Sequence, residues 1–388
     1  MNIIRINSFI LILYIYLVSI SLLLAPFVST FFVENLLLIS LIFITLCINK
    51  FKVNVKIIMF FGFLILFVSI NLLVVSYKQY VLGDGVNLIL HSFIPIYLLS
   101  LKLISFSIFK KIWIKVSIIF TYILPVYYLY RQSGYISYFD IGFIAHLNIL
   151  IMTYHLMSLK RRSYKMLFYL TINILVVAIL GSRLVLISSL VTSLFTYLLL
   201  SNKKNAKFYF NISLISIIVL LIFQNLIAVL NYINNIILSL GLNSRNLSMF
   251  IAQLSGRYDN STIVSGRDNI YPIIIEYLID NGFFPSGFGV ARTLTNGAYY
   301  HAHNFLLELL LIFGFFGLII ILYYFFVKIR ILIKFKNFHE NRIILDFLLL
   351  FLVSYMVRSL MGTYFVKDVI FLIFLAIIFS IKKEKIKN

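Results

Sequence analysis

The residue best placed to do chemistry is His303, which ends a long polar segment and directly precedes a long apolar run. A histidine at such a boundary can act as a base near neutral pH. Asn304 follows it, and Gly314 and Gly317 lie further along, about one helical turn apart, which would let a neighbouring helix approach closely. Taken alone, a histidine in this position is more often a tolerated polar residue.

The polar segment before His303 contains arginines but no lysine. The four arginines between residues 231 and 302 are Arg245, Arg257, Arg267 and Arg292, and the segment also holds four acidic residues, Asp259, Asp268, Glu276 and Asp280. Arginine binds phosphate oxygens through a planar fork, whereas lysine is a point charge. The segment therefore indicates phosphate binding, with pairing between arginines and acids as the alternative.

Three further charged residues lie within or beside apolar runs. Arg183, in the segment 180–184, is the most unusual, because a charge at membrane depth must face a cavity, a partner or water. A tight turn at Gly181-Ser182 with a snorkelling arginine is the alternative. Arg358 is similar but less specific, and Glu308 could pair with an arginine or face a polar cavity.

Membrane helices must position these residues, because the composition does not suit a soluble surface. Of the 388 residues, 62% are apolar and 12% are charged, against ~45–50% and ~25% in soluble domains. At ~20 residues per span, the apolar residues would supply about twelve spans. The net charge of +21 could indicate nucleic-acid binding, but basic residues also collect in cytoplasmic loops, and we favour that explanation.

The predicted fold is an all-α polytopic membrane protein with about 12 transmembrane helices and one large periplasmic or extracellular loop. The predicted spans are residues 7–25, 34–49, 57–76, 88–107, 112–130, 142–159, 166–181, 184–201, 208–230, 303–327, 343–361 and 365–381. The chain is thus divided into spans one to nine (1–230), the large loop (231–302), and the last three spans with a cytoplasmic tail (303–388).

The orientation follows from the basic residues of alternate loops, of which 23 lie on one side and 6 on the other. The side richer in lysine and arginine is normally cytoplasmic. Both termini are therefore predicted in the cytoplasm and the large loop outside. Within that loop, Leu247–Leu254 and Ile270–Ile279 are apolar-rich stretches, and their apolar faces suggest helices on the membrane surface or against the spans. The second is predicted as a short helix, with Asp268 as its N-cap and Gly282 just past its end.

Three motifs, in this order, resemble those of the O-antigen ligase/polymerase superfamily of bacterial envelope glycosyltransferases. They are the turn Gly181-Ser182-Arg183, the pair Gly266-Arg267 with an aromatic four residues later at Tyr271, and His303-Asn304 followed after nine residues by Gly314-x-x-Gly317. The family often has Trp where this chain has Tyr271. Arg257 lies in a second Ser-Gly-Arg without that aromatic, so Arg267 is preferred and Arg257 is its substitute.

The resemblance implies a GT-C-like, metal-independent glycosyltransferase without a cofactor, which uses sugars linked to undecaprenyl diphosphate. Negative charge grows on the departing diphosphate, and arginine is suited to stabilise it. Arg183 and Arg267 would clamp the diphosphate, while His303 positions or deprotonates the acceptor hydroxyl, which attacks with inversion. The further candidate substrate-binding residues are Arg257, Tyr271, Asn304, Arg292, Glu308 and Arg358. The chain has no Asp-x-Asp motif, and no metal site is expected.

Three functions stay open at this point. A polymerase transfers the growing glycan onto the next lipid-linked repeat unit, and a ligase transfers finished polymer onto lipid A core. The bias toward Ile, Leu, Phe, Asn and Lys resembles that of repeat-unit-specific polysaccharide gene clusters and favours the polymerase. A lipid-linked oligosaccharide flippase is the third, but transporters tend to show related halves. Predicted partners are the bilayer, a chain-length regulator and a flippase, for O-antigen, capsule or exopolysaccharide synthesis.

Overall fold

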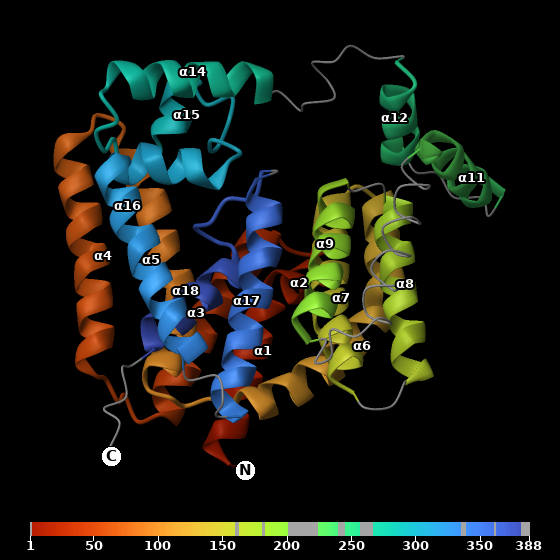
Figure 1. The fold of residues 1–388 in the computed structure, drawn as a ribbon, viewed down its shortest axis with the longest axis horizontal. Helices are drawn as coiled ribbons and strands as arrows, with labels where there is room; N and C mark the ends of the chain where they lie inside the picture. Colours follow the sequence, from red (N-terminus) through yellow and green to blue (C-terminus); the bar gives the residue numbers. More distant parts are fainter. Residues whose placement is uncertain are drawn as a thin grey trace. The chain divides into compact units, whose positions relative to one another are not determined.

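Long apolar runs form helices, because a backbone that lacks water must satisfy its own hydrogen bonds. The computed structural model describes residues 2–159, 163–180, 183–200, 224–239, 245–256, 267–334, 339–360 and 362–381. All regular secondary structure in these ranges is α-helical (Figure 1). The predicted all-α class is therefore confirmed.

The chain divides into two compact units. Unit 1 comprises Met1–Trp113 and Arg267–Asn388, and unit 2 comprises Ile114–Gly266. Unit 1 thus combines the start of the chain with everything from Arg267 onward, including His303.

Unit 1 is built around α5 (Lys78–Ser100), which contacts α3, α4 and α18. At Gly85 of α5 a β-carbon would lie 2.6 Å from Cγ2 of Val68, so α4 and α5 pack closely there. The other helices are α1 (Ile3–Ile15), α2 (Leu17–Leu22), α3 (Thr30–Ile48), α4 (Val55–Val74), the first part of α6 (Phe106–Gln132), α14 (Arg267–Asp280), α15 (Val290–Leu294), α16 (Phe305–Lys334), α17 (His339–Ser359) and α18 (Val369–Ser380).

A small hydrophobic core fixes α14 and α15 against the start of α16. Its fully or almost fully buried residues are Ile270, Ile274, Leu278, Val290, Ala291, Ala302 and Leu311. Figure 1 shows α14 and α15 beside the upper end of α16. Because apolar burial is the main stabilising term, this core holds the segment around His303 against α14.

Within the described residues, unit 2 contains the rest of α6 and five further helices. They are α7 (Tyr138–Ser158), α8 (Tyr164–Leu180), α9 (Arg183–Leu200), α11 (Leu226–Ser239) and α12 (Arg245–Leu254). The helix α7 packs on α8 and α9. Buried amides link these helices, since Nδ2 of Asn148 donates to Oδ1 of Asn173 at 2.9 Å, and Nδ2 of Asn173 donates to Oγ1 of Thr121 at 2.8 Å.

Six of the described helices are long and apolar enough to cross a membrane, namely α3, α4, α5, α6, α7 and α16. Five other apolar helices have 10–17 residues. These helices support a multi-pass membrane protein, and the number of twelve spans stays a prediction. Most of the ninth predicted span, 208–230, lies outside the described residues.

Two local predictions change in the structure. The first predicted span, 7–25, consists of two helices, α1 and α2, which meet at Tyr16. In the segment 231–302, α14 begins at Arg267, so Asp268 lies in its first turn rather than at its N-cap. The other apolar stretch, Leu247–Leu254, lies within α12.

The helix α16 is interrupted at Gly314, whose φ of 67° and ψ of −178° are not helical. A β-carbon at Gly314 would lie 2.8 Å from the backbone oxygen of Phe283 and 2.8 Å from the backbone nitrogen of Pro285. The glycine does permit a close approach, as the sequence indicates. However, its neighbour is the segment after α14 rather than another helix, and that segment is thereby held against α16.

Candidate functional site

His303 lies in a bend directly before α16, with a φ of 54° that is uncommon for residues other than glycine. The carboxylate of Glu308 accepts a hydrogen bond of 2.7 Å from the backbone N–H of Ala302. Oδ1 of Asn304 accepts one of 3.0 Å from the N–H of Leu306, which the helix itself leaves without a partner. Glu308 and Asn304, both predicted to bind substrate, thus shape the bend that carries His303.

Tyr271 ties this bend to α14. Its hydroxyl donates to the backbone carbonyl of His303 at 3.3 Å. On the other flank, the ring of Tyr299 meets the imidazole of His303 edge to face, with centroids 5.8 Å apart. Tyr271 and His303, which belong to two different sequence motifs, therefore lie together.

Arg267 and His303 converge on Gly362, in the turn between α17 and α18. A β-carbon at Gly362 would lie 2.8 Å from Nδ1 of His303 and 3.7 Å from Nη2 of Arg267. The φ of Gly362 is 118°, a backbone conformation that residues with a β-carbon rarely adopt. The structure therefore brings together two of the three predicted catalytic residues, beside a position suited to glycine.

A second histidine completes this cluster. Nε2 of His301 lies 2.8 Å from the carbonyl oxygen of Gly362. Because a carbonyl only accepts, Nε2 carries the proton and Nδ1 of the neutral ring is an acceptor. The ring of His301 lies 4.4 Å from that of His303 and stacks on Tyr364 at 5.0 Å, between centroids.

Both imidazoles are neutral at neutral pH. Burial, followed by the positive charge of Arg267, lowers the pKa of His303 below its usual 6.5. Burial, followed by His303, lowers the pKa of His301 to about 4, although its hydrogen bond to Gly362 opposes the shift. A neutral imidazole can accept a proton, so His303 is available as a general base.

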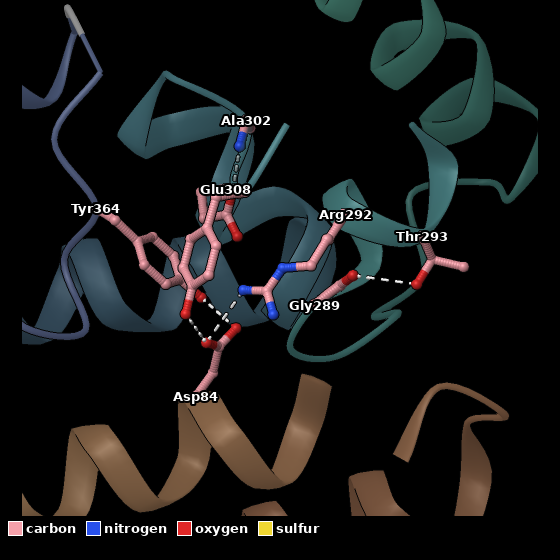
Figure 2. A network of polar contacts seen from close by, with 8 residues as sticks. Asp84, Gly289, Arg292, Thr293, Ala302, Glu308 and Tyr364 are labelled. Atoms are coloured by element: carbon pink, nitrogen blue, oxygen red, sulfur yellow. Dashed lines mark hydrogen bonds and ion pairs between the residues drawn. The ribbon is translucent and has the colours of Figure 1, made fainter. Parts of the chain in front are cut away.

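A buried polar network surrounds Asp84 of α5, whose side chain is fully buried. Oδ2 accepts a hydrogen bond of 2.8 Å from the hydroxyl of Tyr364, and Oδ1 accepts one of 3.1 Å from Tyr300. Nη2 of Arg292 lies 3.4 Å from Oδ1. Figure 2 shows Arg292 and Tyr364 reaching Asp84 from different segments.

The phenols of this network remain hydrogen-bond donors. Burial is the main cause that raises the pKa of Tyr364, and the carboxylates of Glu308 and Asp84 raise it further. Burial and Asp84 likewise raise the pKa of Tyr300, while Arg292 opposes the shift. Protonated phenols suit the acceptor-only carboxylate of Asp84.

Arg292, predicted to bind substrate, is held by this network. Its guanidinium lies 3.6 Å from the ring centroid of Tyr300 and 4.6 Å from that of Tyr80. Cation–π contacts of this kind add to its ion pair with Asp84. The structure therefore gives Arg292 an internal partner within unit 1.

Arg358, also predicted to bind substrate, is 1% exposed and forms a buried ion pair. Its Nη1 lies 2.8 Å from Oδ2 of Asp368, and its Nη2 lies 2.9 Å from Oδ1. This two-pronged geometry is the strongest that arginine makes with a carboxylate. Asp368 also caps α18, because Oδ1 accepts from the N–H of Phe371 at 2.9 Å. The pair therefore connects the end of α17 to the start of α18.

Two predicted arginines remain without a described environment. Arg257 lies outside the described residues, and Arg183 is the first residue of α9 in unit 2, without a described side chain. Among the residues that the structure describes, no group of three or more His, Cys, Asp or Glu side chains could hold a metal ion.

Sequence analysis gave no role in the site to Asp84, His301, Gly362 or Tyr364. A signal for Asp84 was present, since it is an acid between two glycines within an apolar run, in a chain with only 12 acidic residues. No signal marks Gly362 or Tyr364, because their importance depends on neighbours distant in the sequence.

The comparisons with known proteins agree with the motifs. Residues 166–322 match the family model described as O-antigen ligase. No curated protein and no solved structure matches the chain. The matched range contains α14, Arg267 and His303, so the site described above lies largely within it. Over these residues, the chain is therefore similar to the O-antigen ligase family.

Proposed function

We propose that this protein is a polysaccharide polymerase, which transfers a growing glycan from undecaprenyl diphosphate onto the next lipid-linked repeat unit. The observation that carries the proposal is the convergence of Arg267 and His303 on Gly362. A cation and a neutral base side by side are what a glycosyl transfer from a diphosphate requires. The family match and the apolar helices support a lipid-linked substrate at a membrane.

In the proposed reaction, Arg267 acts on the leaving group. As the bond between the anomeric carbon and the phosphate oxygen breaks, the electron pair leaves with the diphosphate. The guanidinium offers two parallel donors and a full positive charge to the oxygens on which charge grows. Arg183 is proposed as a second cation for the same diphosphate.

His303 acts on the acceptor. The hydroxyl of the incoming sugar attacks the anomeric carbon from the face opposite the diphosphate, which inverts that carbon. As the new carbon–oxygen bond forms, the hydroxyl proton moves to the neutral imidazole of His303. Burial, followed by the positive charge of Arg267, keeps the pKa of His303 below its usual value, so the ring is unprotonated before the transfer begins.

The other predicted substrate-binding residues take supporting roles in this proposal. Glu308, Asn304 and Tyr271 hold the bend around His303. Arg292 neutralises Asp84, and Arg358 joins two helix ends through Asp368. Arg257 remains a proposed substitute for Arg267.

The protein is proposed to lie in the bacterial cytoplasmic membrane, with both termini in the cytoplasm and the site at the outer face. The excess of basic residues in alternate loops supports this orientation. A flippase would then supply the lipid-linked repeat units, and a chain-length regulator would act on the product.

An O-antigen ligase is the second candidate, because the matched family model carries that description. A ligase breaks the same bond and needs the same cation and base. It differs only in the acceptor, which would be lipid A core instead of a lipid-linked repeat unit.

Deletion of the gene separates the candidates. Surface and lipid-linked glycans are resolved on gels, with complementation by wild type and by His303→Ala. A polymerase deletion leaves single repeat units on the final acceptor and no ladder, and only wild type restores the ladder. Long chains that accumulate on undecaprenyl diphosphate would instead identify a ligase. Loss of repeat units from the outer face would favour the flippase and remove His303 from catalysis.

A further inference from the structure

Asp84 is a fully buried carboxylate that lies in α5, far in sequence from every motif of the site. A buried charge is costly unless ion pairs and hydrogen bonds satisfy it. Asp84 meets this demand with donors from three other segments, Arg292 of α15, Tyr300 before α16 and Tyr364 before α18. Because the loss of a donor leaves the charge less compensated, the carboxylate fixes these segments relative to α5.

Tyr364 connects Asp84 to the histidine cluster. Its hydroxyl donates to Asp84, and its ring lies nearly parallel to His301, at an interplanar angle of 17°. Nε2 of His301 in turn binds the carbonyl of Gly362, and the ring of His301 lies 4.4 Å from that of His303, between centroids. An unbroken series of contacts therefore runs from Asp84 to the proposed base.

A second carboxylate holds the same segment from the other direction. Glu308 of α16 binds the backbone N–H of Ala302, which lies between the two histidines. The backbone of this segment is thus held by α16, whereas the ring of His301 is held through Tyr364 by α5. The ring of His301 is therefore packed by a residue that is bonded to α5, and not by α16.

We propose that Asp84 is a positioning residue, which acts through the hydroxyl of Tyr364 to hold His301 and the turn at Gly362 against His303 and Arg267. The inference rests on the proposed glycosyl transfer for its effect on rate. Its structural part concerns the packing of His301 and is measurable without any transfer reaction.

The test measures the carbethoxylation of His301 and His303 by diethyl pyrocarbonate, with mass spectrometry, in the full-length protein in detergent. In wild type, His301 should react slowly, because Nδ1 is buried and Nε2 is bonded to Gly362. Tyr364→Phe and Asp84→Asn each remove a hydrogen bond to a buried charge. Each should therefore raise the reactivity of His301 by about 10-fold. Tyr364→Phe keeps the ring, so it carries the test if Asp84→Asn does not fold.

Three further variants sharpen the test. In the double variant of Asp84→Asn and Tyr364→Phe, His301 should react as fast as in Asp84→Asn alone, because both changes interrupt the same series of contacts. Tyr300→Phe removes the hydroxyl bound to the other oxygen and should leave the reactivity of His301 within about 2-fold of wild type. Tyr323→Phe, on an exposed face of α16, should change neither reactivity nor polymer formation.

Activity gives the second readout, with lipid-linked repeat units extracted from the deletion strain. Asp84→Asn and Tyr364→Phe should lower kcat by about 10-fold with little change in KM. In both variants the acid limb of the pH profile should move up toward 6.5, the usual histidine value, as His303 gains water. A merely structural role would reduce the amount of folded enzyme and leave the pH profile in place.

An unchanged reactivity of His301 in Tyr364→Phe would overturn the proposal. Equal increases in the reactivity of His301 in Tyr300→Phe and Tyr364→Phe would overturn it as well, because Asp84 would then not act on His301 through Tyr364 in particular. If wild type forms no polymer while the reactivities change as expected, the proposed function fails and the positioning of His301 by Asp84 stands.

Discussion

Gly362 faces the imidazole of His303 so closely that a β-carbon on it would lie 2.8 Å from Nδ1. The same β-carbon would lie 3.7 Å from Nη2 of Arg267. The proposed base and the proposed cation therefore share one neighbour, which comes from a turn with no recognised motif. The size of residue 362 should consequently control the reaction.

Gly362→Ala should reduce polymer formation by ~10²-fold, because a displaced catalytic group loses its alignment with the reacting atoms. Gly297→Ala is the matched control, since Gly297 has a φ of 83° with nothing within 4 Å of a β-carbon. Both changes strain the backbone, but only the first displaces His303. Initial rates of chain extension in membranes measure the difference. Equal rates for the two variants would contradict the expectation that a β-carbon at residue 362 displaces His303.

Arg267→Gln should lower kcat by ~10²–10³-fold, the effect of removing one transition-state donor. Arg267→Lys should recover only part of this, because lysine keeps the charge but not the planar fork. Arg131→Gln, at the end of α6, is the control for loss of one arginine. Near-normal rates for Arg267→Gln in an extension assay would remove Arg267 from the diphosphate site.

The pH dependence reports on the pair of Arg267 and His303. The pKa of His303 is lowered below 6.5, so the base stays neutral to a lower pH than an ordinary histidine does. The rate then declines as the pH passes below the lowered pKa and the imidazole takes up a proton. Arg267→Gln removes a cause of the lowering, so the acid limb of its residual rate should move to higher pH. An acid limb that stays in place, or moves to lower pH, would show that Arg267 does not act on His303.

Arg358 and Asp368 should affect stability more than chemistry. Breaking a buried ion pair costs about 3–5 kcal/mol, because one charge is left unpaired. Arg358→Met and Asp368→Leu should therefore each lower the melting temperature in detergent, and the double variant should regain part of the loss. If either single variant melted like wild type and yet made no polymer, Arg358 would be a substrate-binding residue, as its sequence context suggests.

The sequence identifies those parts of the site that a local motif carries. Arg267, Tyr271 and His303 stand at recognisable spacings, and in the structure Tyr271 bonds to His303 while Arg267 lies beside the same glycine. The helical class follows from composition alone, since so apolar a chain must satisfy its backbone internally.

Contacts between residues distant in sequence could not be predicted from such motifs. Arg292 has a side chain suited to bind phosphate, but in the structure it forms an ion pair with Asp84 of α5. Asn304 belongs to the motif His303-Asn304 and was predicted to bind substrate, but its side chain caps α16. Gly314 signals a close approach without revealing that its neighbour is the segment after α14. In each case residue type indicates what a group can do, and only packing decides what it meets.

The most direct test of the account is a count of bonds made against lipid released. Purified protein is supplied with lipid-linked repeat units from the deletion strain, and linkages and free undecaprenyl diphosphate are quantified together. Wild type should release one lipid diphosphate for each linkage formed, and His303→Ala and Arg267→Gln should form almost none. Linkage formation at the wild-type rate by His303→Ala, or lipid release without linkage, would contradict transfer by Arg267 and His303.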